Sequence, residues 1–208
     1  MSDRRVIGPR LSLGYLVAVG GVCAAIVTTQ DPGAEEVRAV IRVTAFTSAM
    51  AFLPAFAASA LHRLRPSAAT RWLVTNRRYL GLSVAASHWW HLVAIITLVR
   101  SFPSGGAGIE PFTKLLGGAG FVFLALMAAT SNDASQRALG RAWGVLHTVG
   151  VYVVWLDFIF TYMGTATIAP FHAVMTLVFA AAFAVRMLAW SSRLRDARNT
   201  RSRPQAAA

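Results

Sequence analysis

Six long apolar segments constrain this chain more than any other feature of its sequence. They lie at about Leu11–Thr29, Val43–Leu61, Tyr79–Val99, Leu115–Thr130, Trp143–Met163 and Ile168–Trp190. A helix needs about 20 apolar residues to cross a bilayer, and charged residues make up only 13% of the chain. We therefore predict an all-α integral membrane protein, a six-transmembrane-helix bundle over residues 1–190.

The distribution of Lys and Arg predicts how the bundle is oriented. Cytoplasmic loops carry an excess of these residues. Of the 20 in the chain, a bundle with both termini cytoplasmic leaves only Arg38, Arg42, Arg100 and Lys114 outside. The third and fifth spans then run parallel. Residues 191–208 form a basic cytosolic tail that we expect to be partly disordered.

The net charge of +12 does not indicate a nucleic-acid-binding protein. The arginines flank apolar segments and do not line a solvated face with aromatic residues between them. The charge fits contact with membrane lipid instead, because basic residues next to a span bind anionic headgroups.

Four histidines and one aspartate lie within the predicted spans, where ionisable residues are rare and usually functional. They are His88, His91, His147, Asp157 and His172. Histidine is the commonest metal ligand, so histidines on two facing helices are typical of a bis-histidine haem. The alternative is that they only form hydrogen bonds between helices. Asp157 either handles protons or pairs with one of the outer arginines.

The surrounding sequence favours haem over the other metal groups. Gly144 and Gly150 lie three residues before and after His147, which would let a porphyrin approach the helix backbone. Cys23 is the only cysteine, which argues against a zinc site with thiolate ligands. No CxxCH motif is present, so covalent c-type attachment is excluded and the haem would be b-type.

Two motifs resemble the ferric-reductase-like transmembrane family, in particular the haem-binding membrane subunits of bacterial methionine-sulfoxide reductase systems. They are RRYLGL at 77–82, followed by His91, and LGRAWGVLH at 139–147. The resemblance implies a b-haem protein of the bacterial inner membrane. It would pass electrons from quinol or a cytosolic flavoprotein, such as a flavin reductase, to a periplasmic acceptor such as a molybdenum-dependent methionine-sulfoxide reductase. A quinone or flavin site on the cytoplasmic side is a further implication.

The family pattern places the haem ligands at His91 and His147. Arg77, Arg78 and Arg141 are candidates for binding the haem propionates or an anionic cytosolic donor, with lipid headgroups as the alternative. A further histidine that family members carry on the fifth helix is replaced here by Phe160, which favours one haem over two. If Arg78 and Arg141 lie at the same depth in the membrane, the depth of His88 is closer to that of His147 than the depth of His91 is. His172 is the next candidate ligand.

Two alternatives to this function stay open on the sequence. One is a ferric or quinone reductase membrane module with another partner. The other is a structural or transport membrane protein without haem.

Overall fold

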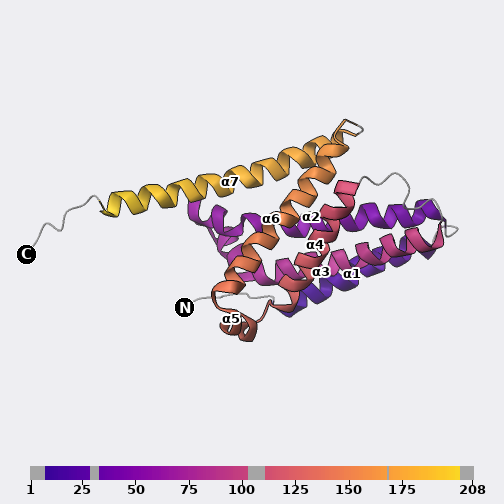
Figure 1. Cartoon of the computed structure of the whole chain (residues 1–208), viewed down its shortest axis with the longest axis horizontal. Coiled ribbons are helices and arrows are strands. Elements are labelled where there is room, and N and C mark those ends of the chain that lie inside the picture. Colours follow the sequence, from indigo (N-terminus) through magenta and orange to yellow (C-terminus); the bar gives the residue numbers. More distant parts are fainter. Residues whose placement is uncertain (1–7, 29–32, 103–110, 168, 202–208) are drawn as a thin grey trace, which may run out of the picture.

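The structure is a computed structural model that describes residues 8–28, 33–102, 111–167 and 169–201 (Figure 1). These residues form seven α-helices and no β-strand: α1 (Pro9–Thr28), α2 (Ala34–Leu64), α3 (Ala68–Ser101), α4 (Pro111–Ala129), α5 (Asp133–Leu139), α6 (Arg141–Gly164) and α7 (Pro170–Arg201). All except α5 are long and apolar enough to cross a membrane. The predicted all-α class with six such helices is therefore confirmed. The predicted span ends Thr29 and Ile168 lie outside the described residues.

Several helices extend beyond the predicted apolar spans. α3 begins at Ala68, well before Tyr79, because Ser67 caps it: the Ser67 hydroxyl accepts a bond from the Thr70 amide (3.2 Å), and the Thr70 hydroxyl accepts one from the Ser67 amide (2.9 Å). α7 continues past Trp190 through the basic segment to Arg201, in which no proline or glycine interrupts it.

The short helix α5 is an element that the apolar pattern does not predict. The Asn132 side chain caps its first turn by accepting a bond from the Ser135 amide (2.8 Å). Gly140 ends it with a φ of 48°, a left-handed conformation that a residue with a Cβ rarely adopts. This turn leads the chain directly into α6.

Helices α1, α2 and α3 pack side by side, with α2 antiparallel to the other two. The Tyr15 hydroxyl of α1 donates to the Thr47 carbonyl of α2 (2.5 Å). The Trp90 ring of α3 donates to the Leu16 carbonyl of α1 (3.1 Å). Gly20 makes room for that ring, because a Cβ there would lie 2.8 Å from Trp90 Cζ2.

Helix α4 lies between α3 and α6 and runs antiparallel to both. The His88 ring of α3 lies 5.4 Å from the Phe121 ring of α4. Asp133, which follows α4 in the chain, forms an ion pair with Arg78, ten residues before His88 on α3. On α6, Asp157 contacts Gly117, near the start of α4. α3 and α6, the third and fifth long helices, are consequently parallel.

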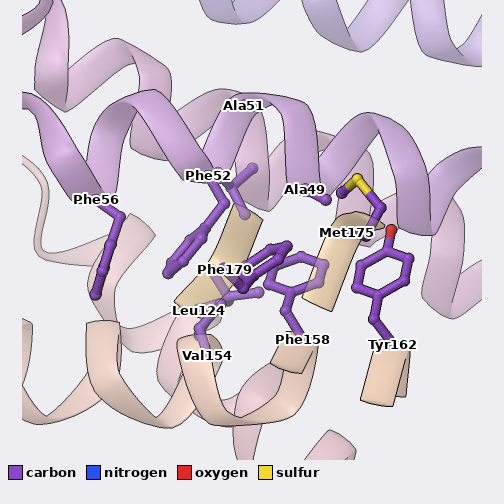
Figure 2. Packing of buried hydrophobic residues seen from close by; sticks show 11 residues of the cluster. Ala49, Ala51, Phe52, Phe56, Leu124, Val154, Phe158, Tyr162, Met175 and Phe179 are labelled. Atoms are coloured by element: carbon purple, nitrogen blue, oxygen red, sulfur yellow. The ribbon is translucent and has the colours of Figure 1, made fainter. Parts of the chain in front are cut away.

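The central contact between α2, α6 and α7 is a cluster of aromatic side chains (Figure 2). The Phe158 ring lies 5.3 Å from Phe52 and 5.2 Å from Phe179, and Tyr162 lies 5.8 Å from Phe179. In lipid, helices associate through close packing, because the hydrophobic effect does not act between them there. The tilted and offset ring pairs provide that packing.

Candidate cofactor site

A cavity of about 640 Å³ lies where α2, α3, α4, α6 and α7 meet near the arginine-rich helix ends. Ligand-binding cavities in proteins usually measure about 300–1,000 Å³. Three of the predicted site residues line this one: Arg78, Gly144 and His147. The other polar or charged lining residues are Thr75, Arg77, Tyr79, Ser131, Asp133, Gln136, Trp143, Thr148 and Arg186.

His147 is held in the cavity wall by two neighbours. The Trp143 ring, one helical turn earlier, stacks on the imidazole with centroids 4.1 Å apart. The Thr130 hydroxyl donates to the Leu126 carbonyl (2.7 Å) and lies 3.1 Å from His147 Nε2. Since the hydroxyl proton is used on Leu126, its oxygen accepts from Nε2–H, and a neutral imidazole then keeps an unprotonated Nδ1. That nitrogen is the one able to bind a metal.

Two arginines of the cavity wall bond to helix α2 instead of to a carboxylate. Arg77 Nε donates to the Ala55 carbonyl (3.1 Å). Arg186 Nη1 donates to the Phe56 carbonyl (2.7 Å), and its guanidinium carbon lies 4.4 Å from the centre of the Phe56 ring. Within the described residues neither forms an ion pair. Two such cations make the cavity suitable for a carboxylate or phosphate group.

Of the three arginines that the sequence offered for the propionates, Arg78 and Arg141 have surroundings that differ from those of Arg77. Arg78 lines the cavity but pairs with Asp133 of α5 at 2.5 Å. Arg141 is exposed beside Val145 and Thr148 and is not among the residues that line this cavity. Arg186 was missed as a site residue, although an arginine between Val185 and Met187 inside an apolar span is itself a signal of function.

His88 and His91 do not line the cavity, because both face α2. His88 Nδ1 lies 2.8 Å from the Ser48 hydroxyl. His91 Nδ1 lies 2.9 Å from the Thr44 hydroxyl and 3.1 Å from the Ile41 carbonyl. A carbonyl only accepts, so Nδ1 of His91 carries the proton and Nε2 does not.

The structure does not bring these histidines together with His147. His88 and His91 contact Phe121, and His147 contacts Thr130. Phe121 lies in α4 and Thr130 directly follows that helix, so the two are about 13 Å apart along the helix axis at 1.5 Å per residue. Two imidazole nitrogens on one metal ion must lie about 4 Å apart, taking about 2.0 Å for each bond.

The depths predicted from the sequence were counted from Arg78 and Arg141, which lie at different positions in their helices. α3 starts at Ala68, so Arg78 lies about 15 Å along its axis, whereas Arg141 is the first residue of α6. The depths of His88 and His147 are therefore not comparable when counted from these arginines.

The other predicted site residues lie apart from the cavity. His172 Nδ1 lies 3.4 Å from the Thr165 carbonyl, at the opposite end of the bundle. Gly150 packs against α4, where a Cβ would lie 2.8 Å from Met127 Sδ. A Cβ on Gly144 would meet nothing within 4 Å, so of the two glycines only Gly144 opens on the cavity.

In the described ranges no group of three or more His, Cys, Asp and Glu side chains is placed to hold a metal ion. No protein-family model matches the sequence, and no solved structure matches the chain significantly.

Proposed function

We propose that this protein is a membrane electron-transfer protein that binds b-type haem in the cavity beside His147. Its arginine-rich ends face the cytoplasm of a bacterium, and the protein lies in the inner membrane. Electrons enter from quinol or a cytosolic flavoprotein and leave to an acceptor on the periplasmic side. By the resemblance of its two motifs, that acceptor is a molybdenum-dependent methionine-sulfoxide reductase.

The observation that carries this proposal is the set of groups around one cavity. His147 offers an unprotonated nitrogen from a ring fixed by Trp143 and Thr130. Arg77 and Arg186 offer two cations without a carboxylate partner among the described residues. An axial imidazole and cations for two propionates are what a b-type haem requires of a protein. When bound, haem supplies one-electron chemistry whose potential the protein tunes through burial and hydrogen bonds.

The fit to haem is limited to one axial ligand. The residues that contact the α3 histidines and His147, Phe121 and Thr130, are about 13 Å apart along the helix axis, so in this arrangement of the helices His91 and His147 do not share one iron. The proposal therefore assigns the cavity to His147 and leaves His91 outside it. A haem held by one histidine keeps an open position on its iron, and the reduced protein should then bind carbon monoxide.

A second candidate function is favoured by the hydrogen bonds of the α3 histidines. His88 and His91 each bond to a hydroxyl group of α2, as polar residues do between membrane helices. A structural or transport protein without haem would use them in this way. It would not require a cavity lined by His147 and arginines.

The test is the absorption spectrum of the purified full-length chain produced with supplemented haem. We expect a Soret band that shifts on dithionite reduction, about one haem per chain, and loss of both in His147→Gln. Glutamine retains a terminal N–H that can bond Thr130 and removes the metal-binding ring. His172→Ala is the matched control and should keep the haem. A colourless wild-type protein would refute the proposal.

A positive spectrum leaves the partner to be identified. The reduced protein is mixed in turn with a quinone, a ferric chelate or a methionine-sulfoxide reductase, and reoxidation of the haem is followed. Reoxidation by the methionine-sulfoxide reductase supports the proposed acceptor, whereas reoxidation by the chelate or the quinone alone supports a ferric or quinone reductase module.

A further inference from the structure

Asp157 is the one carboxylate of the described residues that lies well inside an apolar helix. The others are near helix beginnings or in the basic extension of α7: Glu35, Glu36, Asp133 and Asp196. Asp157 lies seven residues before the end of α6 at Gly164, about 10 Å along the axis. This position is within the apolar part of the span.

The carboxyl group of Asp157 rests in a notch made by two glycines of α4. A Cβ built on Gly120 would lie 3.4 Å from Oδ2, and one on Gly117 would lie 3.7 Å from Oδ1. Within the described residues Asp157 forms no ion pair, and no hydrogen bond to its side chain is found there. The salt bridge with Arg42 or Arg100 that the sequence left open is not formed.

No cation of the packed helices is placed to neutralise Asp157. Lys114 is the only charged residue of α4, and it is not within ion-pair distance. The α3 histidines do not pair with it either, since no ion pair joins His88 or His91 to Asp157. No ion pair joins Asp157 to any of the other titratable groups described on α5, α6 and α7. These groups are Asp133, Arg137, Arg141, His147, Tyr152, Tyr162, His172, Arg186, Arg193, Arg195, Asp196 and Arg198.

An ionised carboxylate without a partner in an apolar environment is costly, and such groups become neutral instead. The Asp157 side chain is only partly buried, so the acid remains accessible beside Gly117 and Gly120 of α4. We propose that Asp157 is a proton-exchange site inside the membrane, a neutral carboxylic acid at neutral pH whose proton exchanges with water. This inference does not depend on haem binding.

Infrared difference spectroscopy of the full-length protein in lipid vesicles tests the inference. At pH 7 we expect a C=O stretching band of a protonated carboxylic acid that is present in the wild type and absent in Asp157→Asn. The band should move to lower frequency in D₂O, because the proton exchanges. Asp196→Asn removes an exposed carboxylate and should leave the band unchanged.

Two glycine variants provide a matched pair on α4. Gly120→Ala adds a methyl group at the carboxyl oxygen and should shift the band, whereas Gly118→Ala enters open space and should not. If Asp157→Asn does not fold, carbodiimide labelling of the wild type replaces it, because carbodiimides react with protonated carboxyls in apolar surroundings. Peptide mapping should then find the label on Asp157.

The inference is overturned if no such band is lost in Asp157→Asn, or if the band does not shift in D₂O. Failure to label Asp157 in the replacement experiment has the same consequence. These measurements do not require bound haem, so their outcome is independent of the outcome of the haem test.

Discussion

Replacing Gly150 with alanine tests how closely α6 packs on α4. The new Cβ would lie 2.8 Å from Met127 Sδ, closer than real Cβ contacts, and 3.1 Å from Phe123 Cδ1, tighter than most of them, so both side chains must shift. Overpacking of this kind costs about 1–3 kcal/mol, and the better helix propensity of alanine returns at most about 1 kcal/mol. We expect Gly150→Ala to be neutral to about 2 kcal/mol less stable than the wild type.

Gly144→Ala on the same helix is the matched control. Its Cβ meets nothing within 4 Å, so it gains the helix propensity without the clash. The gain in helix propensity is the same in both variants and cancels. The free energy of unfolding of Gly150→Ala should therefore be about 1–3 kcal/mol lower than that of Gly144→Ala. For a chain of this length that corresponds to roughly 2–12 °C in unfolding temperature.

The single cysteine of the chain provides the assay. Cys23 is buried, with 7% of its surface exposed, so a thiol-reactive fluorophore reports when the bundle opens on heating. Gly150→Ala should react at a lower temperature than Gly144→Ala. An equal or higher temperature for Gly150→Ala would refute the close α4–α6 contact.

Three further variants are followed with the same fluorophore. Thr44→Val removes one of the two groups that bond His91, and because the Ile41 carbonyl remains, we expect a loss of about 0.6 kcal/mol. Trp90→Phe keeps an aromatic ring against α1 but loses the hydrogen bond from the indole N–H, which should lower the free energy of unfolding by about 1 kcal/mol. An unchanged unfolding temperature would contradict that hydrogen bond. Asp196→Asn breaks an exposed ion pair and should cost less than about 0.5 kcal/mol.

The six long helices could be predicted because their apolar length has one physical explanation. A backbone in lipid must satisfy its own polar groups, and a run of about 20 apolar residues does so as a helix. The helix ends could not be read in the same way. Outside the lipid a polar segment can continue a helix when it is capped, as Ser67 caps α3, and hydropathy carries no signal of this.

The relative levels of histidines on different helices could not be predicted from the sequence. They depend on how the helices are shifted against each other along their axes, and counting residues from Arg78 on α3 and from Arg141 on α6 does not give that shift. Gly144 and Gly150 lie at the same sequence distance from His147, so the sequence could not show which of them faces a cofactor. Only the packing shows that Gly150 faces Met127 and that Gly144 faces the cavity. Neither difference is encoded within a single helix.

The role of His91 is the point at which the family resemblance and the packing disagree, and one pair of substitutions separates them. Asparagine places its amide N–H close to the position of Nδ1, so His91→Asn can keep the bond to the Ile41 carbonyl (3.1 Å in the wild type) while removing Nε2. His91→Ala removes both. If haem is bound beside His147 alone, as the packing indicates, His91→Asn keeps the haem content and the unfolding temperature of the wild type. His91→Ala then lowers the unfolding temperature, because α2 loses a bonded partner.

Loss of haem from His91→Asn at unchanged stability would contradict this reasoning. It would mean that Nε2 of His91 reaches the iron and that α3 and α6 are shifted relative to their positions here. Such a shift would separate the Phe158 ring from His88, which it contacts at 5.6 Å. The measurement therefore decides between two packings of α3 as well as between two ligands.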